Sequence, residues 1–422
     1  MNLNRLDPEL LQLNLVGDDE RGYDFVDDTL VLELKRLRPE HGMLSVYLDI
    51  TPETLASRPA MTRFKQGIEA IRERHAEAWN HEQKTTFEQV ARDLGERLEK
   101  LLARPRGKGL ALFAAPARVL PKKEKVDYAI FCSFHLPHPP ADRIEWGDAP
   151  VLAPLLVQRD ESPRTGVVLF DRERLRPFLA FMGEVAAYDL VLRNDDPVPL
   201  TKSHSWHGYG EHNHQQWQEE HYRRYLRQAA LAVEKLAQAG DWKWLVLASP
   251  DRQEAEHLRE QLPAAWRERV IGSVALPMEA DLNGVRDAVL PVIAEAERRE
   301  ERQTLERWQG EVERPEGLGV AGLADTLLAV EEYRVQTLVA DEGFTHKGWQ
   351  CEDCGGLVAD LMEEPPAECP WCSSTALREL PDIVGEMAVL VMASGGDVEI
   401  VHDPDNRRLI GEHGRIGGIL RF

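Results

Sequence analysis

Two C-x-x-C pairs in the last quarter of the chain constrain its fold more than any other feature. Cys351 and Cys354 form the first pair, Cys369 and Cys372 form the second, and fourteen residues separate the pairs. This spacing lies within one residue of the zinc-ribbon template, in which two tight turns present four thiolates at tetrahedral positions. Free cysteines or a disulfide are the alternative. We expect a structural Zn²⁺, because four cysteine ligands leave no position for a reactive water.

The charge balance limits the partners that the chain can bind. Its 422 residues include 51 basic and 73 acidic side chains, which gives a formal net charge of −22. Such a chain repels nucleic acid at long range, which argues against a protein that coats DNA or RNA generically. Binding to one shaped RNA site would have to use local basic patches, and binding to DNA is not expected.

The fifth cysteine and the first thirty residues indicate the compartment. Cys132 is expected to be a buried thiol, and a four-cysteine zinc site requires a reducing environment. The first thirty residues are acidic without a signal-peptide pattern, and no run of eighteen apolar residues occurs. We therefore expect a cytoplasmic protein with no membrane partner.

Strand patterns alternate with helix patterns, which predicts an α/β protein. The length favours two to three domains. We expect an N-terminal arm, three α/β domains, and a zinc ribbon inserted in the third. The expected bounds are 1–28 for the arm, 29–145, 146–278 and 279–422 for the domains, and 349–376 for the ribbon.

Hydrophobic periodicity places the main elements. The expected strands are 44–49, 109–114, 129–134, 166–171, 244–248, 337–340 and 398–401, with 177–187 either a strand or a short helix. The expected helices are 61–103 with a break near His81, 217–239, 251–269, 282–309, 319–330 and 388–393. Ser249 is expected to cap the 251–269 helix, with Pro250 at its first position.

The last third carries a recognisable sequence. It reads Gly319-Val-Ala-Gly-Leu-Ala-Asp-Thr-Leu-Leu-Ala-Val-Glu331, then Val335-Gln-Thr-Leu-Val339, the cysteine pairs, and finally Gly411-Glu-His-Gly-Arg-Ile-Gly-Gly-Ile-Leu-Arg-Phe422. This order resembles the C-terminal domain of the archaeo-eukaryotic class-I peptide-release-factor and Pelota family, whose archaeal members carry a similar cysteine insertion. The chain is most similar to the bacterial branch, which includes Balon-type ribosome hibernation factors.

The resemblance also bears on hydrolysis. Release factors of this family carry His-Gly-x-Gly-Gly-Gln in the middle domain, and here His207, Gly208 and Gly210 match while the Gly-Gly-Gln triplet is absent. The side chains of residues 211–214 would block the close backbone approach that glycine allows. We expect no catalytic residue and no hydrolysis. A peptidyl-tRNA hydrolase that uses Gln215 or Gln216 is the alternative.

The same segment holds the candidate RNA-binding residues. Five of the fourteen histidines fall within 204–221, which indicates either an RNA-facing loop or a second metal site. Aromatic rings can stack on unpaired bases, and arginines on one helix can meet phosphates, although these arginines could instead only solubilise the helix. The candidates are His204, Trp206, His207, Tyr209, His212, His214, Gln215, Gln216, Arg223, Arg224 and Arg227.

The resemblance implies a translation factor that binds ribosomal RNA at the aminoacyl-tRNA site. It would act in ribosome hibernation or in rescue of stalled ribosomes, without hydrolysis. The N-terminal domain would face the decoding region, and the C-terminal domain would meet the stalk base or a translational GTPase such as EF-Tu. A protein-interaction adaptor without an RNA role is a further alternative.

Overall fold

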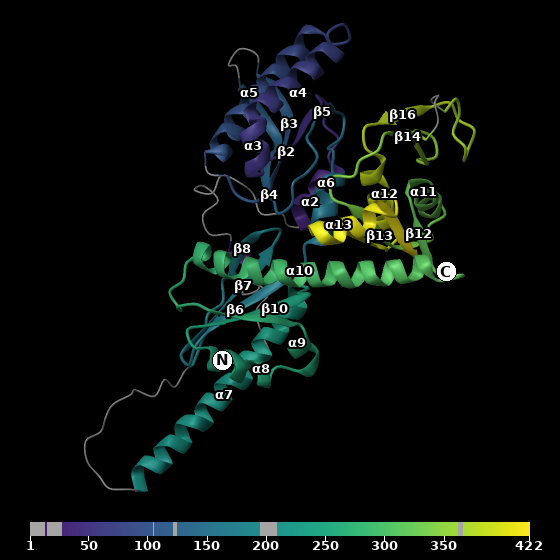
Figure 1. Cartoon of the computed structure of the whole chain (residues 1–422). Coiled ribbons are helices and arrows are strands. Elements are labelled where there is room, and N and C mark those ends of the chain that lie inside the picture. The colour runs from purple at the N-terminus through teal and green to yellow at the C-terminus, as the bar shows by residue number, and fades with distance from the viewer. Residues whose placement is uncertain (1–12, 15–27, 104, 121–124, 195–208, 362–365) are drawn as a thin grey trace. The chain divides into compact units, whose positions relative to one another are not determined.

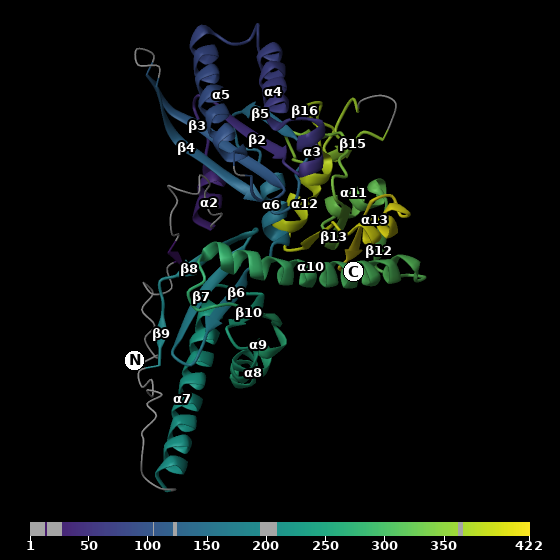
Figure 2. The same cartoon turned by 60° about the vertical axis from the view of Figure 1, so that its left-hand side comes forward.

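The computed structural model describes residues 13–14, 28–103, 105–120, 125–194, 209–361 and 366–422 (Figures 1 and 2). Within helix α7 (Tyr209–Ala239), side chains are described from residue 219 onwards. The chain forms two compact units, and each unit is assembled from two separate stretches of sequence. The first comprises residues 1–18 and 162–296, and the second comprises residues 19–161 and 297–422.

The first unit is built on a seven-stranded mixed sheet. Its strand order is β1-β8-β7-β6-β10-β11, and β9 also pairs with β7. Strands β6, β10 and β11 are mutually parallel. Strand β7 pairs antiparallel with β6 on one side and with β8 on the other. The bounds are β1 Leu13–Asn14, β6 Thr165–Phe170, β7 Arg174–Phe181, β8 Glu184–Tyr188, β9 Leu192–Arg193, β10 Trp244–Ser249 and β11 Val270–Ala275.

Helices bury apolar side chains of this sheet. They are α7, α8 (Arg252–Gln261), α9 (Ala264–Glu268) and the first part of α10 (Leu282–Glu313). Val167 of β6 and Val246 of β10 pack in one core with Val285 and Val289 of α10. Strand β6 is buried along its whole length, which suits a sheet whose central strands are covered on both faces.

The expected helix over 251–269 is wrong in two details. Asp251, and not Ser249, caps α8, because its carboxylate accepts a hydrogen bond from the N–H of Gln253. Pro250 accordingly lies before the helix. The helix also breaks at Leu262–Pro263, and α9 begins after Pro263, since proline disfavours helical backbone in the preceding residue.

The second unit begins with an antiparallel sheet in the order β4-β3-β2-β5. Helices α4 and α5 pack side by side on it (Figure 1) and share its apolar core. The expected break near His81 is confirmed: residues 75–80 separate the helices, and Asn80 and Gln83 form a capping box. The bounds are α2 Asp28–Arg36, β2 Met43–Asp49, α3 Pro52–Ser57, α4 Ala60–Arg74, α5 His81–Leu102, β3 Gly109–Leu120, β4 Lys125–Leu136 and β5 Arg143–Gly147.

The rest of the second unit comprises two further sheets. The larger has the order β12-β18-β13-β17, with β13 and β17 parallel, and the ribbon sheet has the order β15-β14-β16. The strands are β12 Gly319–Ala321, β13 Val335–Asp341, β14 Gly348–Cys351, β15 Leu357–Ala359, β16 Leu377–Leu380, β17 Asp397–Val401 and β18 Ile416–Leu420. The helices are α6 Ala153–Glu161, α11 Leu323–Glu331, α12 Ile383–Ala393 and α13 Pro404–Gly411.

The expected α/β class is confirmed, and every strand expected from periodicity is a strand. The alternative left open for 177–187 resolves into β7 and β8. The expected helix at 319–330 is wrong at its start, where β12 precedes α11. Helices α3, α6 and α13 and strands β5 and β11 were not expected. The division into three domains stays a prediction. Among the described helices, none combines the length and apolar character that a membrane span requires.

Candidate functional site

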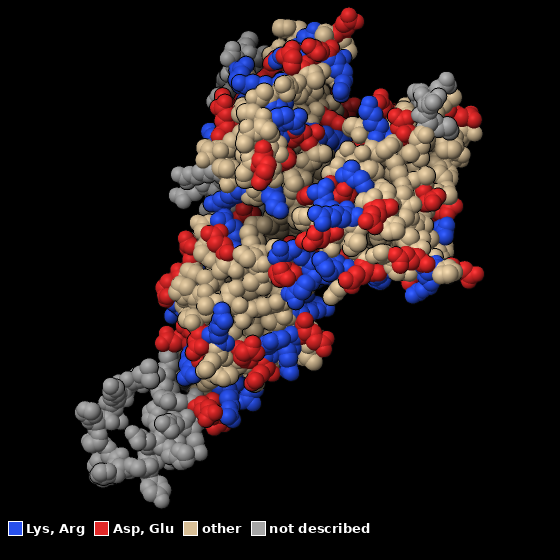
Figure 3. Space-filling model, in the orientation of Figure 1, with Lys and Arg blue, Asp and Glu red and all other residues tan. Residues whose placement is uncertain are grey.

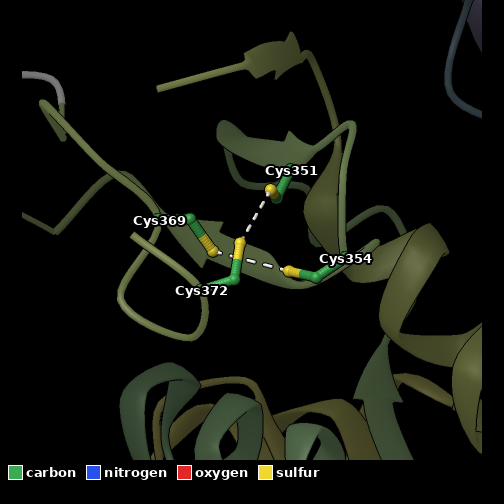
Figure 4. A group of neighbouring side chains, drawn as sticks. All are labelled: Cys351, Cys354, Cys369 and Cys372. Carbon is green, nitrogen blue, oxygen red and sulfur yellow. Dashed lines mark hydrogen bonds between the residues drawn. The ribbon is translucent and has the colours of Figure 1, made fainter. Parts of the chain in front are cut away.

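The four cysteines of the two C-x-x-C pairs converge on one point (Figure 4). Cys351 Sγ lies 3.5 Å from Cys372 Sγ, and Cys354 Sγ lies 3.6 Å from Cys369 Sγ. A disulfide would bring two sulfurs to about 2 Å, so none of these cysteines is paired covalently. Four sulfurs at about 2.3 Å from one ion would lie about 3.8 Å apart, close to the separations found here.

The backbone of the two pairs has the same local design. The residue after each pair, Gly355 or Ser373, has a positive φ, at 78° and 58°. Its N–H donates to the carbonyl of the first cysteine of the pair, at 2.9 Å for Gly355 to Cys351 and 2.8 Å for Ser373 to Cys369. These turns direct both sulfurs of each pair inward. The repeated geometry indicates that the two turns serve one site.

The electrostatics of the cluster favour a bound cation. The backbone N–H of Cys354 lowers the pKa of the Cys351 thiol to about 7. The N–H of Ser374 favours the thiolate of Cys372, but the neighbouring sulfurs, Cys354 first among them, outweigh it and raise the pKa of Cys372 to about 12. Several thiolates therefore crowd one another unless a positive charge lies between them.

The donor set and its spacing fit Zn²⁺, and Cys351, Cys354, Cys369 and Cys372 would hold it. A zinc bound by four thiolates supplies folding free energy and no reactive water. The chain's own residues complete the support: the N–H of Gly356 donates to Cys354 Sγ at 3.4 Å, and the Trp371 indole covers Gly356 while donating to the Leu357 carbonyl.

The candidate RNA-binding residues divide into three groups. His204, Trp206 and His207 lie outside the described residues. Tyr209, His212, His214, Gln215 and Gln216 belong, by their backbone, to the first turns of α7. The helix was expected to begin at Trp217, and it begins at Tyr209 instead. Arg223, Arg224 and Arg227 follow on the same helix, where side chains are described.

The three arginines lie on an exposed arc of α7. At about 100° per residue, positions 223, 224 and 227 span only about 100° of the helix circumference. All three side chains are exposed, whereas Tyr225 and Leu226 are buried against the first unit. Tyr225 and Leu226 thus form a buried stripe on this helix, and Tyr222 is half-buried. Arg223 also meets Glu219 at 2.9 Å, an exposed ion pair that contributes little to stability.

The face of the molecule shown in Figure 3 is mixed in charge. Lys and Arg side chains alternate with Asp and Glu side chains over the face shown in Figure 3. In a chain of net charge −22, such a face offers no broad positive field to a polyanion. Any phosphate contact would be local, as at the arginines of α7.

A half-buried cluster of histidines and glutamates was missed in the sequence. His138 and His402 stack on each other, and Glu161 and Glu342 lie beside them. The members are up to 264 residues apart, counting from 138 to 402, so no local motif could have shown them. One signal was available: Glu342 and His402 directly follow the strands β13 and β17, whose carboxyl ends meet at one sheet edge if the strands are parallel.

Comparison with known families locates the clearest relationship in the middle of the chain. Residues 150–298 match the family model described as bacterial archaeo-eukaryotic release factor family 10. This segment is release-factor-like. The match covers just over a third of the chain, and it confirms the resemblance inferred from the sequence. It includes most of the first unit, with helix α7 and its arginines.

Solved structures of the same class align at low identity. The archaeal translation termination factor aRF1 is 18% identical over 93% of this chain and 96% of that chain, with a TM-score of 0.24. Archaeoglobus fulgidus Pelota is 12% identical over 74% and 79%, with a TM-score of 0.32. S. cerevisiae Dom34 is 10% identical over 74% and 86%, with a TM-score of 0.38. TM-scores below 0.5 do not establish a common overall arrangement. No curated protein matches the chain.

Proposed function

We propose that the protein is a translation factor that binds the ribosome at the aminoacyl-tRNA site and hydrolyses nothing there. The proposed role is hibernation of idle ribosomes or rescue of stalled ones in the cytoplasm. The observation that carries this proposal is the match of residues 150–298 to a bacterial family of archaeo-eukaryotic release factors. In such factors, the corresponding domain is the part that reaches the peptidyl-transferase centre.

Helix α7 supports a contact with ribosomal RNA. Arg223, Arg224 and Arg227 project from one exposed arc, while Tyr225 and Leu226 on the same helix are buried in the first unit. Guanidinium groups bind phosphate oxygens bidentately, and a rigid helix holds several of them in register. The acidic remainder of the chain favours a single shaped RNA site over non-specific coating.

The backbone around Gln215 and Gln216 supports occupation without hydrolysis. Both residues lie within helix α7, which already begins at Tyr209. A release factor places its glutamine on a glycine loop that fits closely against the peptidyl-tRNA end, and only glycine adopts such dihedrals freely. A helical backbone with side chains at 211–214 differs from that loop. We therefore propose no hydrolysis by Gln215 or Gln216.

The remaining parts of the proposal rest on the resemblance in the last third of the chain. We assign a structural Zn²⁺ to the four-cysteine cluster, where it would hold the ribbon sheet β15-β14-β16 together. We assign the region around that ribbon to contact with the stalk base or a translational GTPase such as EF-Tu. The predicted N-terminal domain, residues 29–145, would face the decoding region.

A charge reversal on α7 tests the RNA contact. We expect Arg223→Glu with Arg224→Glu to weaken co-sedimentation with purified ribosomes at least tenfold, because two attractive arginine–phosphate interactions become repulsive. The slope of log affinity against log salt should fall by about 2, since each arginine that neutralises a phosphate contributes about 1 to it.

The matched control is Arg193→Glu with Arg252→Glu, which makes the same change in net charge at exposed positions of the same unit. This control should bind ribosomes as the wild type does. Equal binding by the α7 variant and the wild type would remove the helix from the proposed interface. An equal loss of ribosome binding by the control would show that the α7 variant binds less well only because of its net charge.

A further inference from the structure

His138 and His402 form a nearly parallel ring stack inside the second unit. Their ring centroids are 3.5 Å apart and their planes differ by 11°. His138 follows strand β4, and His402 follows strand β17. The stack therefore joins the loop after β4 to the edge of the β12-β18-β13-β17 sheet.

Carboxylates hold His402 on both sides. Its Nδ1 lies 2.9 Å from Glu342 Oε1, and its Nε2 lies 3.6 Å from Glu161 Oε2. The side chain of Glu161 is only 8% exposed, and its other oxygen accepts a hydrogen bond from the N–H of Ile400. Two carboxylates on opposite ring nitrogens favour an imidazolium. Burial lowers the pKa of His402, but Glu161 and Glu342 outweigh it and raise the pKa to about 10.

Hydrogen bonds to its backbone hold His138 in place, and the surroundings of its imidazole favour the neutral form. Gln158 of α6 accepts from the N–H of His138 at 3.2 Å and donates to its carbonyl at 3.0 Å. Its imidazole Nδ1 is buried without a hydrogen-bond partner. Burial lowers the pKa of His138 well below its ordinary value, and the charges of His402 and Lys108 lower it further. The pair is thus one charged ring on one neutral ring.

A metal ion is the other occupant that these residues could suggest, since ligand atoms of His138, Glu342 and His402 lie within 4.8 Å of one another. An imidazole binds a metal through a lone pair in the plane of its ring. Two rings stacked at 3.5 Å with nearly parallel planes cannot both direct such a lone pair at one ion. The geometry fits a stack and does not fit shared ligation.

We propose that the stacked His138–His402 pair is a pH-sensitive latch, which holds the loop after β4 against the carboxyl ends of β13 and β17 and opens when His138 takes up a proton. A second proton would place two imidazolium rings face to face, so the stack becomes repulsive. The amide of Gln158 holds the backbone of His138 against α6, which itself packs against β17. Separating the loop after β4 from this edge therefore also breaks the two hydrogen bonds of Gln158.

Other charged groups face the pair, and they set the background for any pH effect. They are Glu161 from α6, Glu297 and Glu301 from α10, Glu342 after β13, Arg407 from α13 and Lys108 before β3. Burial raises the pKa of Glu297 to about 7, and burial also raises that of Glu161.

These contributions have different signs. The lowered pKa of His138 favours the open form as pH falls below 6.5, the ordinary histidine value. The raised pKa of His402 stabilises the closed form fully below 6.5, and this contribution is lost as pH rises towards 10. The raised pKa of Glu297 instead favours the closed form as pH falls through 7. A variant must therefore isolate the contribution of His138.

Hydrogen exchange on the full chain, corrected for the intrinsic rate at each pH, measures the opening. We compare wild type with His138→Phe, which keeps a stacked ring and removes the titrating group, in peptides covering 133–142 and 398–403. Glu161, Glu297 and Glu342 are present in both proteins, so their common contribution largely cancels. The equilibrium constant for opening in the wild type, divided by that in the variant, should rise about tenfold from pH 7.5 to pH 5.5. This is the rise expected if His138 has an ordinary pKa in the open state.

His75→Phe is the matched control. His75 stacks on Trp79 at 4.4 Å in the same unit, and burial lowers its pKa, but it has no second histidine against it. In that variant the pH dependence of exchange at 133–142 should stay that of the wild type. A wild-type to His138→Phe ratio that stays constant between pH 5.5 and 7.5 overturns the latch.

A second measurement covers the case in which His138→Phe does not fold. Histidine ring titration by NMR on the wild-type chain should show His402 protonated at pH 8 and His138 still neutral at pH 6. Two rings that both titrate near pH 6.5 would contradict the latch. A second metal ion per chain, beyond the one in the four-cysteine cluster, would also contradict the latch if the Cys369→Ser variant still bound it.

Discussion

At the scale of single residues, the glycines and cysteines of the ribbon are the most constrained positions. Gly355 takes the left-handed backbone that its turn requires, and Ser373 takes the same conformation in the second turn. Gly356 is constrained differently, by space: an added Cβ would lie 2.5 Å from the Trp371 ring. The sequence made the cysteines and the first turn predictable, because both rest on local spacing.

Gly356→Ala should destabilise the ribbon by about 1–3 kcal/mol, because the methyl group forces the Trp371 indole away from its position. The free energy of unfolding, measured by chemical denaturation, checks this. Gly310→Ala is the control, since that position lies in helix α10 with open space around it. There alanine should be neutral or stabilise by up to about 1 kcal/mol. Equal effects of the two substitutions would contradict the packing assigned to Trp371.

Metal content tests the four-cysteine cluster. We expect about one Zn per chain in protein purified without chelator, and Cys369→Ser should lose most of it together with the folding free energy that the metal supplies. Elemental analysis of both proteins measures this. Cys132→Ser is the control, because Cys132 lies in β4, outside the cluster. Wild-type protein with far less than one Zn per chain would refute the ribbon site.

The His138–His402 pair shows where residue-level prediction stops. His138 and His402 come together only because β4 ends near α6 and because β17 pairs in parallel with β13. No spacing along the chain encodes that meeting. Pairs of residues that meet only through tertiary contacts can be identified only once the fold is known.

At the scale of elements, hydrophobic periodicity predicted the strands well and the helix ends poorly. Strand β2 runs from Met43 to Asp49, one residue longer than expected. Helix α7 instead starts at Tyr209 and not at Trp217, because the His-rich segment before Trp217 lacks the apolar spacing that marks a helix. Helix α13 was missed for a similar reason: only eight residues long, it contributes a single buried apolar side chain, Ile410.

Helix α10 carries a proline in its interior. Pro291 lies ten residues into the helix, where it cannot donate to the carbonyl one turn before it. We expect Pro291→Ala to raise the free energy of unfolding by about 1–3 kcal/mol. Glu295→Ala, an exposed position one turn later in the same helix, should change it by less than about 0.5 kcal/mol. Destabilisation by Pro291→Ala would show that the proline is needed in the native backbone.

At the scale of the whole molecule, the α/β class was predictable because strands and helices alternate along the chain. The assembly of two units from interleaved stretches was not. Helix α6 directly precedes β6 of the first unit in sequence but packs, through Val157, in the core of the second. Such placement depends on which apolar faces fit together, and a single sequence does not display that.

The proposed function also belongs to this scale, since under that proposal the whole chain would occupy the site of a tRNA. The segment 150–298 supplies the family relationship, α7 supplies the arginines, and the net charge of −22 restricts RNA binding to a local contact. Together these features favour one specific ribosomal site.

Competition for the aminoacyl-tRNA site is the most direct test of this account. Purified full-length protein should co-sediment with ribosomes whose aminoacyl-tRNA site is empty, and prior filling of that site with tRNA should reduce binding at least tenfold, without release of peptide from peptidyl-tRNA. Binding that is indifferent to tRNA in the site, the absence of binding to ribosomes, or rapid peptide release by the wild-type protein would contradict it.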